Sequence, residues 1–262
     1  MRSMNPLRTL MAAAILCGTF IGYAQAETFG DFTYTDQGDS VTITGYSAVS
    51  FGAVNIPAEI GGKPVTAIGD KAFYCEGVTA LTIPGSVISI GDYAVGACHY
   101  LKTLTIPAGV KSLGPGAFFH CDGLEKLTFS TGLSTIGEQS FAYCAKLTEV
   151  VIPDGVTSIG DGAFFNCTEL EQVSIGGDVV SIGNWIFEQC GKIKRVTFAS
   201  GVNMIPRWVF ANCGNLTSVK IPRSVTSIDE GAFAGCRALK EVALPSSLDS
   251  IGDSAFSSTG LA

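Results

Sequence analysis

Residues 159–179 read IGDGAFFNCTELEQVSIGGDV, and this stretch recurs along most of the chain. Its pattern is I-G-x-x-A-F-x-x-C-x-x-L-x-x-V-x-I-P-x-x-V, with Gly176 where most copies carry proline. The apolar residues that open successive copies are 23 residues apart after a first step of 22: Ile68, Ile90, Leu113, Ile136, Ile159, Ile182, Ile205, Ile228 and Ile251. A fixed period of this length indicates a solenoid of stacked coils.

One copy predicts two short extended segments. The stretch Leu170–Ile175 ends in the period-2 alternation of a strand with one buried face. Proline then ends the strand, as at Pro153, because it lacks the N–H that a ladder requires. The second segment runs from Val156 to Ile159. Stacked about 4.8 Å apart, such strands bury a core that no single copy could close, and the first segments should form one long sheet.

The remaining part of each copy predicts a tight turn. The spacing of Ala163, Phe164 and Cys167 favours a single helical or 3₁₀ turn with Phe and Cys facing inward. The glycine after each opening residue is replaced by Pro206 in one copy, and proline fixes φ near about −65°. We therefore expect close packing, and not a positive φ, to be the reason for this glycine column.

The repeat resembles the BspA-like, 23-residue class of leucine-rich repeats, which occurs in secreted and cell-surface proteins. The resemblance covers Ile68 to Phe256. It implies a right-handed superhelix of parallel strands and short helical or 3₁₀ turns, with about nine 23-residue coils. Residues 27–66 resemble the N-terminal cap of that family, which leaves residues 67–262 as repeats without an evident C-terminal cap.

Residues 1–26 have the features of an export signal. Arg2 and Arg8 precede the uncharged apolar run 10–23, and Ala24-Gln25-Ala26 is a small-x-small site, so cleavage is predicted after Ala26. A retained membrane anchor is the weaker interpretation, and Leu16 before Cys17 disfavours lipidation. We expect a secreted or surface-exposed protein with no membrane span after cleavage.

Composition and motifs exclude several classes of function. The chain carries 16 Lys and Arg against 23 Asp and Glu, a formal net charge of −7, which argues against a nucleic-acid partner. It has two histidines and none of the common nucleophile, phosphate-binding or zinc-protease motifs, so we expect no enzyme and no cofactor. His99 and His120 flank different cysteines, on opposite sides, and are expected to point in different directions as surface residues without a metal.

Eight cysteines recur every 23 residues: Cys75, Cys98, Cys121, Cys144, Cys167, Cys190, Cys213 and Cys236. Equivalent positions of stacked coils are about 4.8 Å apart, whereas a disulfide needs Cβ atoms nearer about 3.8 Å. We therefore predict a structural ladder of buried thiols. Isolated disulfides and a metal site are the weaker alternatives, and no CxxC pair supports the latter.

An acidic column follows the glycines: Asp70, Asp92, Glu138, Asp161, Glu230 and Asp253. Stacked carboxylates could bind calcium. The favoured interpretation is that each acid caps the helical turn that begins there.

The outward residues of the first extended segment are the candidate partner-binding residues. They are Lys102, Lys126, Glu149, Gln172, Lys194, Arg195, Lys220 and Glu241. Rigid solenoid faces commonly bind proteins, so the hypothesis is an adhesion-type module for a host matrix or cell-surface protein. Carbohydrate binding is less favoured, because the outward columns of this face lack aromatic residues.

The C-terminal residues 257–262 follow Phe256 without a recognisable capping unit. Exposed apolar surface and a free strand edge would favour pairing with another chain. Three interpretations stay open: a truncated chain, a loosely capped end, and edge-to-edge dimerisation. The alternative function is therefore a structural or assembly protein that self-associates, or joins a missing C-terminal region, through its last repeat.

Overall fold

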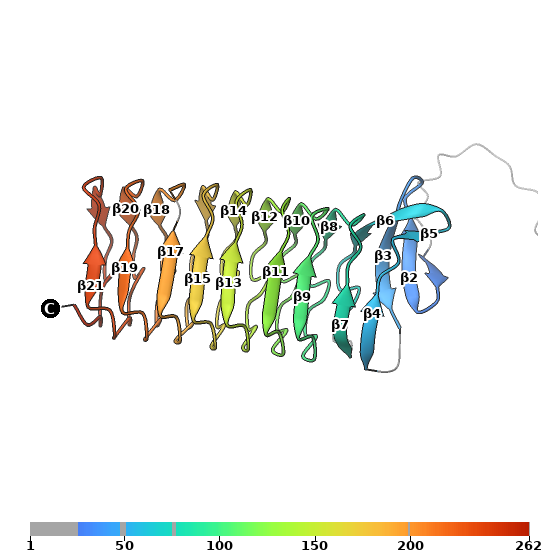
Figure 1. Ribbon diagram of the computed structural model, residues 1–262, viewed down its shortest axis with the longest axis horizontal. Helices are drawn as coiled ribbons and strands as arrows, with labels where there is room; N and C mark the ends of the chain where they lie inside the picture. Colours follow the sequence, from blue (N-terminus) through green and yellow to red (C-terminus); the bar gives the residue numbers. More distant parts are fainter. Residues whose placement is uncertain (1–25, 48–50, 75–76, 199, 262) are drawn as a thin grey trace, which may run out of the picture.

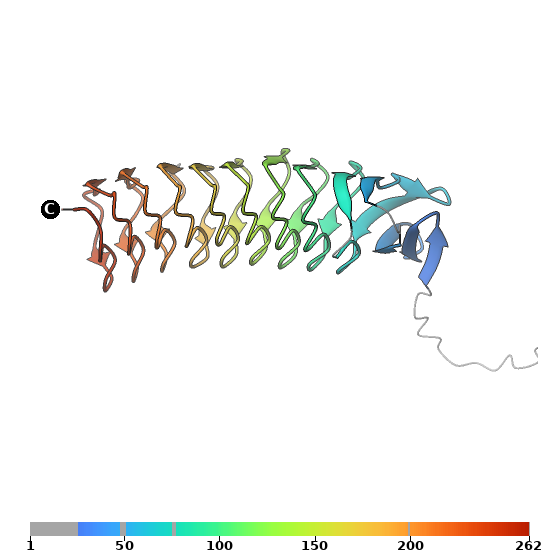
Figure 2. The same cartoon turned by 90° about the horizontal axis from the view of Figure 1, so that it is seen from below.

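The computed structural model describes residues 26–47, 51–74, 77–198 and 200–261. The chain forms an elongated solenoid whose coils follow one another in sequence order along a single axis (Figures 1 and 2). All of the predicted export signal except Ala26 lies outside the described residues. The repeat solenoid expected from the sequence is confirmed.

An antiparallel unit lies at the N-terminal end of the solenoid (Figure 1). Strands β1 (Ala26–Phe29), β2 (Phe32–Asp36) and β3 (Val41–Tyr46) pair in this order, and β3 then pairs in parallel with β6 (Lys63–Ile68). β5 (Glu59–Ile60) pairs with β6 in antiparallel orientation. That residues 27–66 serve as a cap stays a prediction.

The second extended segment of each repeat forms a two-residue strand. These strands continue the sheet of β3 and β6 in exact register, so that Ser112 and Leu113 pair with Ser89 and Ile90. The result is a ten-stranded sheet, which ends at the coil of Ile182. Its repeat strands are β8 (Ser89–Ile90), β10 (Ser112–Leu113), β12 (Thr135–Ile136), β14 (Ser158–Ile159) and β16 (Ser181–Ile182); β18 (Met204–Ile205), β20 (Ser227–Ile228) and β22 (Ser250–Ile251) form a separate sheet. We call these strands together the short-strand side.

The first extended segment forms the longer strands, which we call the long-strand face. They are β4 (Gly52–Asn55), β7 (Val78–Thr82), β9 (Thr103–Ile106), β11 (Lys126–Phe129), β13 (Glu149–Ile152), β15 (Gln172–Ile175), β17 (Arg195–Phe198), β19 (Ser218–Lys220) and β21 (Glu241–Ala243). The expectation of one long sheet here is wrong. The strands form four groups, β4-β7, β9-β11, β13-β15-β17 and β19-β21.

Two of the three breaks in the long-strand face follow a bulky residue. Phe129 ends β11 and Phe198 ends β17, at the place where β9, β13 and β15 carry isoleucine. Each of these rings meets the ring of a core phenylalanine edge-on, Phe141 or Phe210, at 5.7 and 5.9 Å between ring centroids. Both rings are only half-buried. A larger side chain at this place therefore coincides with the loss of strand pairing to the next coil.

The turns are not helical, which corrects the predicted helical or 3₁₀ turn. No residue in the described ranges lies in a helix. Residues three and seven places after the opening residue have positive φ, as Trp185 (46°) and Gln189 (65°) do. Alternate amides of the turn point along the solenoid: Trp185 N donates to Arg207 O, and Phe187 N donates to Val209 O, one coil further on. Inter-coil hydrogen bonds thus replace the helical ladder.

The glycine column is explained by close packing, as expected. Gly137 and Gly160 do not have positive φ. A Cβ atom at Gly137 would lie 2.5 Å from Leu113 O, and one at Gly160 would lie 2.5 Å from Glu138 N. Backbone of the preceding coil therefore occupies the space of a side chain.

Columns of identical residues fill the core. Seven phenylalanine rings stack face to face along the axis, 5.3 to 5.6 Å apart and within 14° of parallel: Phe118, Phe141, Phe164, Phe187, Phe210, Phe233 and Phe256. Rows of Ile, Leu and Val from both kinds of strand pack with them. The same core therefore supports both sides of the solenoid.

Candidate protein-binding face

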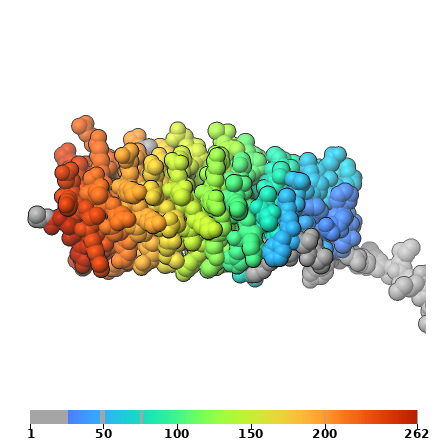
Figure 3. Space-filling view, turned by 60° about the horizontal axis from the view of Figure 1, so that its bottom comes forward, coloured from blue at the N-terminus to red at the C-terminus, as the bar shows by residue number. Residues whose placement is uncertain are grey.

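The eight candidate residues all lie exposed on or beside the long-strand face: Lys102, Lys126, Glu149, Gln172, Lys194, Arg195, Lys220 and Glu241. Strand pairing brings some of them into line, since Gln172 pairs with Glu149 on one side and with Arg195 on the other. Figure 3 shows the coils as successive bands of one rod-shaped surface. A partner would thus meet a row of polar groups repeated from coil to coil.

Lys194 differs from the other candidates because it is already paired. Its Nζ donates a hydrogen bond to Glu171 Oε2 at 2.8 Å, and the contact lowers the pKa of the Glu171 carboxyl group. Both side chains are substantially exposed, so this ion pair contributes little to stability. Lys194 is therefore less available to bind a carboxylate of a partner than a surface lysine without an ion pair would be.

A groove of about 470 Å³ lies where pairing is lost between β11 and β13. Val151 is 53% exposed in it, and Leu127 is half-buried although its neighbour Leu104 is only 2% exposed. The lining residues are Glu125, Lys126, Leu127, Thr128, Phe129, Thr148, Glu149, Val151 and Pro153. Two of the candidates, one cationic and one anionic, thus flank an apolar depression. The sequence did not predict the groove, because it arises from a break in strand pairing.

A row of aromatic side chains on the turn side was also missed. Neighbouring rings meet edge to face at 5.4 to 6.4 Å, and most are half-buried: Tyr74, Tyr93, Phe119, Tyr143, Phe165 and Trp185. Their places in the repeat differ, since Tyr93 and Trp185 lie three residues after the opening residue and Phe119 lies six after it. No single column of the aligned repeats therefore reveals the row.

Two members of the acidic column accept hydrogen bonds from the next coil. Asp70 Oδ1 accepts a hydrogen bond from Asp92 N at 2.8 Å, and Asp161 Oδ1 accepts one from Asn184 N at 2.7 Å. For these two acids the acceptor role is as expected, but the donor belongs to the next coil and not to a helical turn of the same coil. The reason is that the turn is not helical and directs these amides along the axis to the neighbouring coil.

The seven described repeat cysteines are buried, and none of them forms a disulfide. Each Sγ donates to a backbone carbonyl of the preceding coil at 3.1 to 3.6 Å, as Cys144 does to Phe118 O. Burial raises the pKa of the Cys236 thiol to about 12, and it also raises those of Cys121, Cys144, Cys190 and Cys213. Cys75 lies outside the described residues. Such thiols are poor nucleophiles, and we propose that they serve packing alone.

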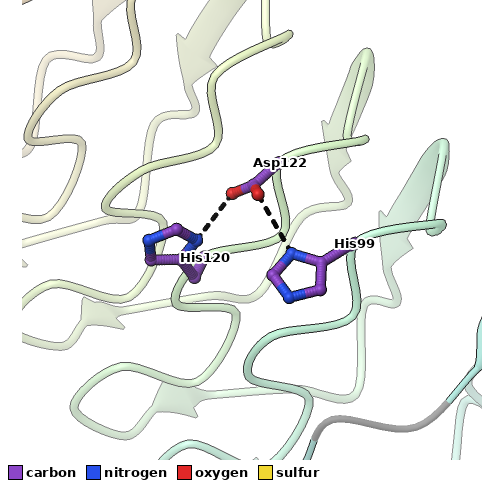
Figure 4. A group of neighbouring side chains, drawn as sticks. All are labelled: His99, His120 and Asp122. Atoms are coloured by element: carbon purple, nitrogen blue, oxygen red, sulfur yellow. Dashed lines mark hydrogen bonds and ion pairs between the residues drawn. The ribbon is translucent and has the colours of Figure 1, made fainter.

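The two histidines do not point apart, which corrects the expectation from the sequence. Both turn Nδ1 toward Asp122: His99 Nδ1 lies 3.0 Å from Oδ2, and His120 Nδ1 lies 2.7 Å from Oδ1 (Figure 4). Asp122 is the counterpart of His99 one repeat later, so stacking brings the two together. The 23-residue register was the signal that could have found this cluster.

The last coil exposes apolar residues that are buried elsewhere. Ile251 is 49% exposed, whereas its counterpart Ile228 is 1% exposed. Leu244 and Leu261 are also exposed. This is the surface to which the self-association hypothesis refers.

The repeats match the family model of the BspA type leucine-rich repeat region, in six copies over residues 66–190 and 157–262. The crystal structure of a Treponema pallidum leucine-rich repeat protein is 28% identical, with 87% of this chain and 86% of that chain covered and a TM-score of 0.53. A leucine-rich cell surface protein from Faecalibacterium prausnitzii is 25% identical, with 89% and 92% covered and a TM-score of 0.41. No curated protein matches the sequence.

Proteins with this kind of repeat are commonly surface proteins, generally bind other proteins and are generally not enzymes. Among the described residues, no helix is long and apolar enough to cross a bilayer. The family model matches well over half of the sequence, and the Treponema pallidum structure has the same fold. The chain belongs to the BspA-type leucine-rich repeat family.

Proposed function

We propose that this chain is a secreted or surface-displayed, non-enzymatic module that binds an extracellular protein through its long-strand face. The observation that carries the proposal is the groove at the β11–β13 break. It combines an exposed apolar residue, Val151, with opposite charges at Lys126 and Glu149. Protein interfaces typically have an apolar centre within a polar rim.

The partner that this arrangement fits is a protein with its own apolar contact residue and both signs of charge around it. Arg195 and Lys220 extend the cationic part of the face toward later coils, and Glu241 provides an acid beyond them. A host matrix or cell-surface protein meets this description. The expected partner is neither a nucleic acid nor a membrane, in view of the net charge of −7.

The test is a binding panel of purified extracellular-matrix and cell-surface proteins, measured by biolayer interferometry at low and high salt. The double variant Lys126→Glu/Val151→Asp should lose at least about tenfold in affinity for any protein captured by the wild type. The wild-type affinity should also fall as salt rises, because the rim charges are exposed.

Lys111→Glu is the matched control. Lys111 is an exposed lysine directly before β10, on the short-strand side, so the variant makes the same charge change away from the groove. If both variants bind as the wild type does, the long-strand face is not the binding surface. If the wild type captures nothing on the panel, the proposed class of partner is contradicted.

Self-association through the last repeat is the second candidate function, favoured by the exposure of Ile251 and Leu244. Sedimentation velocity over a range of concentrations separates it from the first. A dimer that Ile251→Glu dissociates would support it, whereas a monomer at every concentration would eliminate it.

A further inference from the structure

The cluster of His99, His120 and Asp122 arises from two adjacent coils. His99 follows the buried Cys98, and Asp122 follows the buried Cys121 one repeat later. His120 precedes Cys121 and has a φ of 60°. This left-handed backbone lies in the turn, where the ring of His120 is brought beside Asp122, as Figure 4 shows.

The donor atoms of the three side chains converge. One ligand atom from each lies within 4.8 Å of the other two. The two histidine–carboxylate separations are 3.0 Å for His99 and 2.7 Å for His120. Two ligands of one tetrahedral zinc ion, each at about 2.0–2.2 Å, lie about 3.3–3.6 Å apart. Both separations are shorter than this, by about 0.3 Å for His99 and about 0.6 Å for His120, so binding an ion requires the Asp122 carboxylate to move slightly away from both rings.

The contact between His120 and Asp122 lacks the geometry of a hydrogen bond. Nδ1 of His120 and Oδ1 of Asp122 are both hidden from solvent, and neither has a hydrogen-bond partner, although they are 2.7 Å apart. Buried polar atoms in folded proteins almost always have a partner. A cation between nitrogen and oxygen donors would be a partner for both.

The site is held in place by its surroundings. The ring of His120 stacks on that of Tyr143 at 4.9 Å and 12°, and His120 N donates to Ala142 O of the next coil. The rings of His99 and His120 meet edge-on at 5.8 Å. Side chains fixed on rigid, stacked coils lose little freedom on binding an ion, which favours metal affinity.

We propose that His99, His120 and Asp122 bind a divalent transition-metal ion of the zinc class. Two imidazole nitrogens and one carboxylate oxygen suit such an ion, whereas Ca²⁺ and Mg²⁺ prefer oxygen ligands alone. The three side chains are 41 to 49% exposed, so a further coordination position faces solvent and is open to water or to a ligand from a partner. The proposal is independent of the function proposed for the long-strand face, and it replaces the expectation of no metal at these histidines.

The test is a titration of the purified, tag-free protein with Zn²⁺ alone, followed by isothermal calorimetry and by thermal unfolding. We expect one ion per chain and a rise in Tm with added zinc, since an ion that binds only the folded chain stabilises it. Asp122→Asn and His120→Gln should each weaken binding at least about tenfold. Glu125→Gln is the matched control, because Glu125 is an exposed acid three residues from Asp122 and outside the cluster.

Co²⁺ absorption identifies the donor atoms. Nitrogen and oxygen ligation should give weak d–d bands without the intense thiolate charge-transfer bands that cysteine ligation would add. Circular dichroism of each variant excludes misfolding as a cause of lost binding. The proposal is overturned if the wild type takes up no zinc, if Asp122→Asn binds as tightly as Glu125→Gln, or if the cobalt spectrum shows thiolate.

Discussion

The two sides of the solenoid use the same coils but differ in continuity. Five of the two-residue strands continue the N-terminal strands into a ten-stranded sheet and the other three form a second sheet, whereas the longer strands opposite divide into groups of two or three. Strand length therefore does not decide how far a sheet extends here. On the short-strand side, glycines let each coil approach the previous backbone closely, while on the long-strand face a phenylalanine precedes two of the three breaks.

The core shared by both sides gives the largest expected effect. Phe141 is fully buried in the phenylalanine stack and also contacts Phe129 of the long-strand face. Phe141→Ala should lower the free energy of unfolding by about 3–5 kcal/mol. Urea denaturation measures it, with Phe29→Ala at a half-exposed ring as the control, expected within about 0.5 kcal/mol of wild type. Equal effects of the two substitutions would contradict a shared core.

The glycine column should be the next most sensitive feature. In Gly137→Ala the new methyl group meets Leu113 O at 2.5 Å, which should cost about 1–3 kcal/mol of unfolding free energy. Gly85→Ala is the matched control, because nothing lies within 4 Å of its Cβ position. If Gly137→Ala is as stable as Gly85→Ala, close approach of the coils is not what maintains the continuous sheet.

The turns that join the two sides should weaken at alkaline pH. A thiol whose pKa is raised in the folded state stabilises the fold fully below the unfolded value near 9, and this contribution is lost as pH rises toward the folded value. For Cys236, with a pKa of about 12, the loss reaches about 1.4 kcal/mol by pH 10.

The free energy of unfolding, measured between pH 8 and pH 10, gives the slope of stability against pH. The other buried thiols with raised pKa values make it steeper. Cys236→Ala should have a shallower slope than the wild type. Identical slopes for the two proteins would mean that Cys236 titrates as a solvent-exposed thiol does.

The break between β11 and β13 gives the smallest expected effect and the most specific test. Phe129→Ile restores the residue found in β9 and β13, and it should change stability by less than about 1.5 kcal/mol. The amides of residues 149–152 should then exchange with solvent more slowly, because β13 gains a partner strand. Unchanged exchange would show that Phe129 does not cause the break.

Much of the fold follows from the sequence because every coil buries equivalent apolar residues against its neighbours. The 23-residue register, the strands ending before Pro107 and Pro153, and the packing role of the glycines were all predictable. The non-helical turn was not predictable, because the residues with left-handed backbone, Trp185 and its counterparts, have side chains of every kind.

The candidate site was predictable only in part. The exposure of residues such as Lys126 and Glu149 follows from alternation along a strand. The groove between them does not, because it depends on how the half-buried Phe129 packs against Phe141. The metal-binding cluster was accessible in principle, since His99 and Asp122 are one repeat apart. The position of each histidine relative to its own cysteine does not reveal the cluster, because the shared partner Asp122 of His99 lies in the next coil.

Hydrogen–deuterium exchange of the protein, free and bound to a partner captured on the panel, locates the binding surface directly. Exchange should slow in β11 and β13, at residues 126–129 and 149–152, with no change in β8, β10, β12 or β14 on the short-strand side. Protection confined to the short-strand side, with β11 and β13 unaffected, would contradict a binding role for the long-strand face.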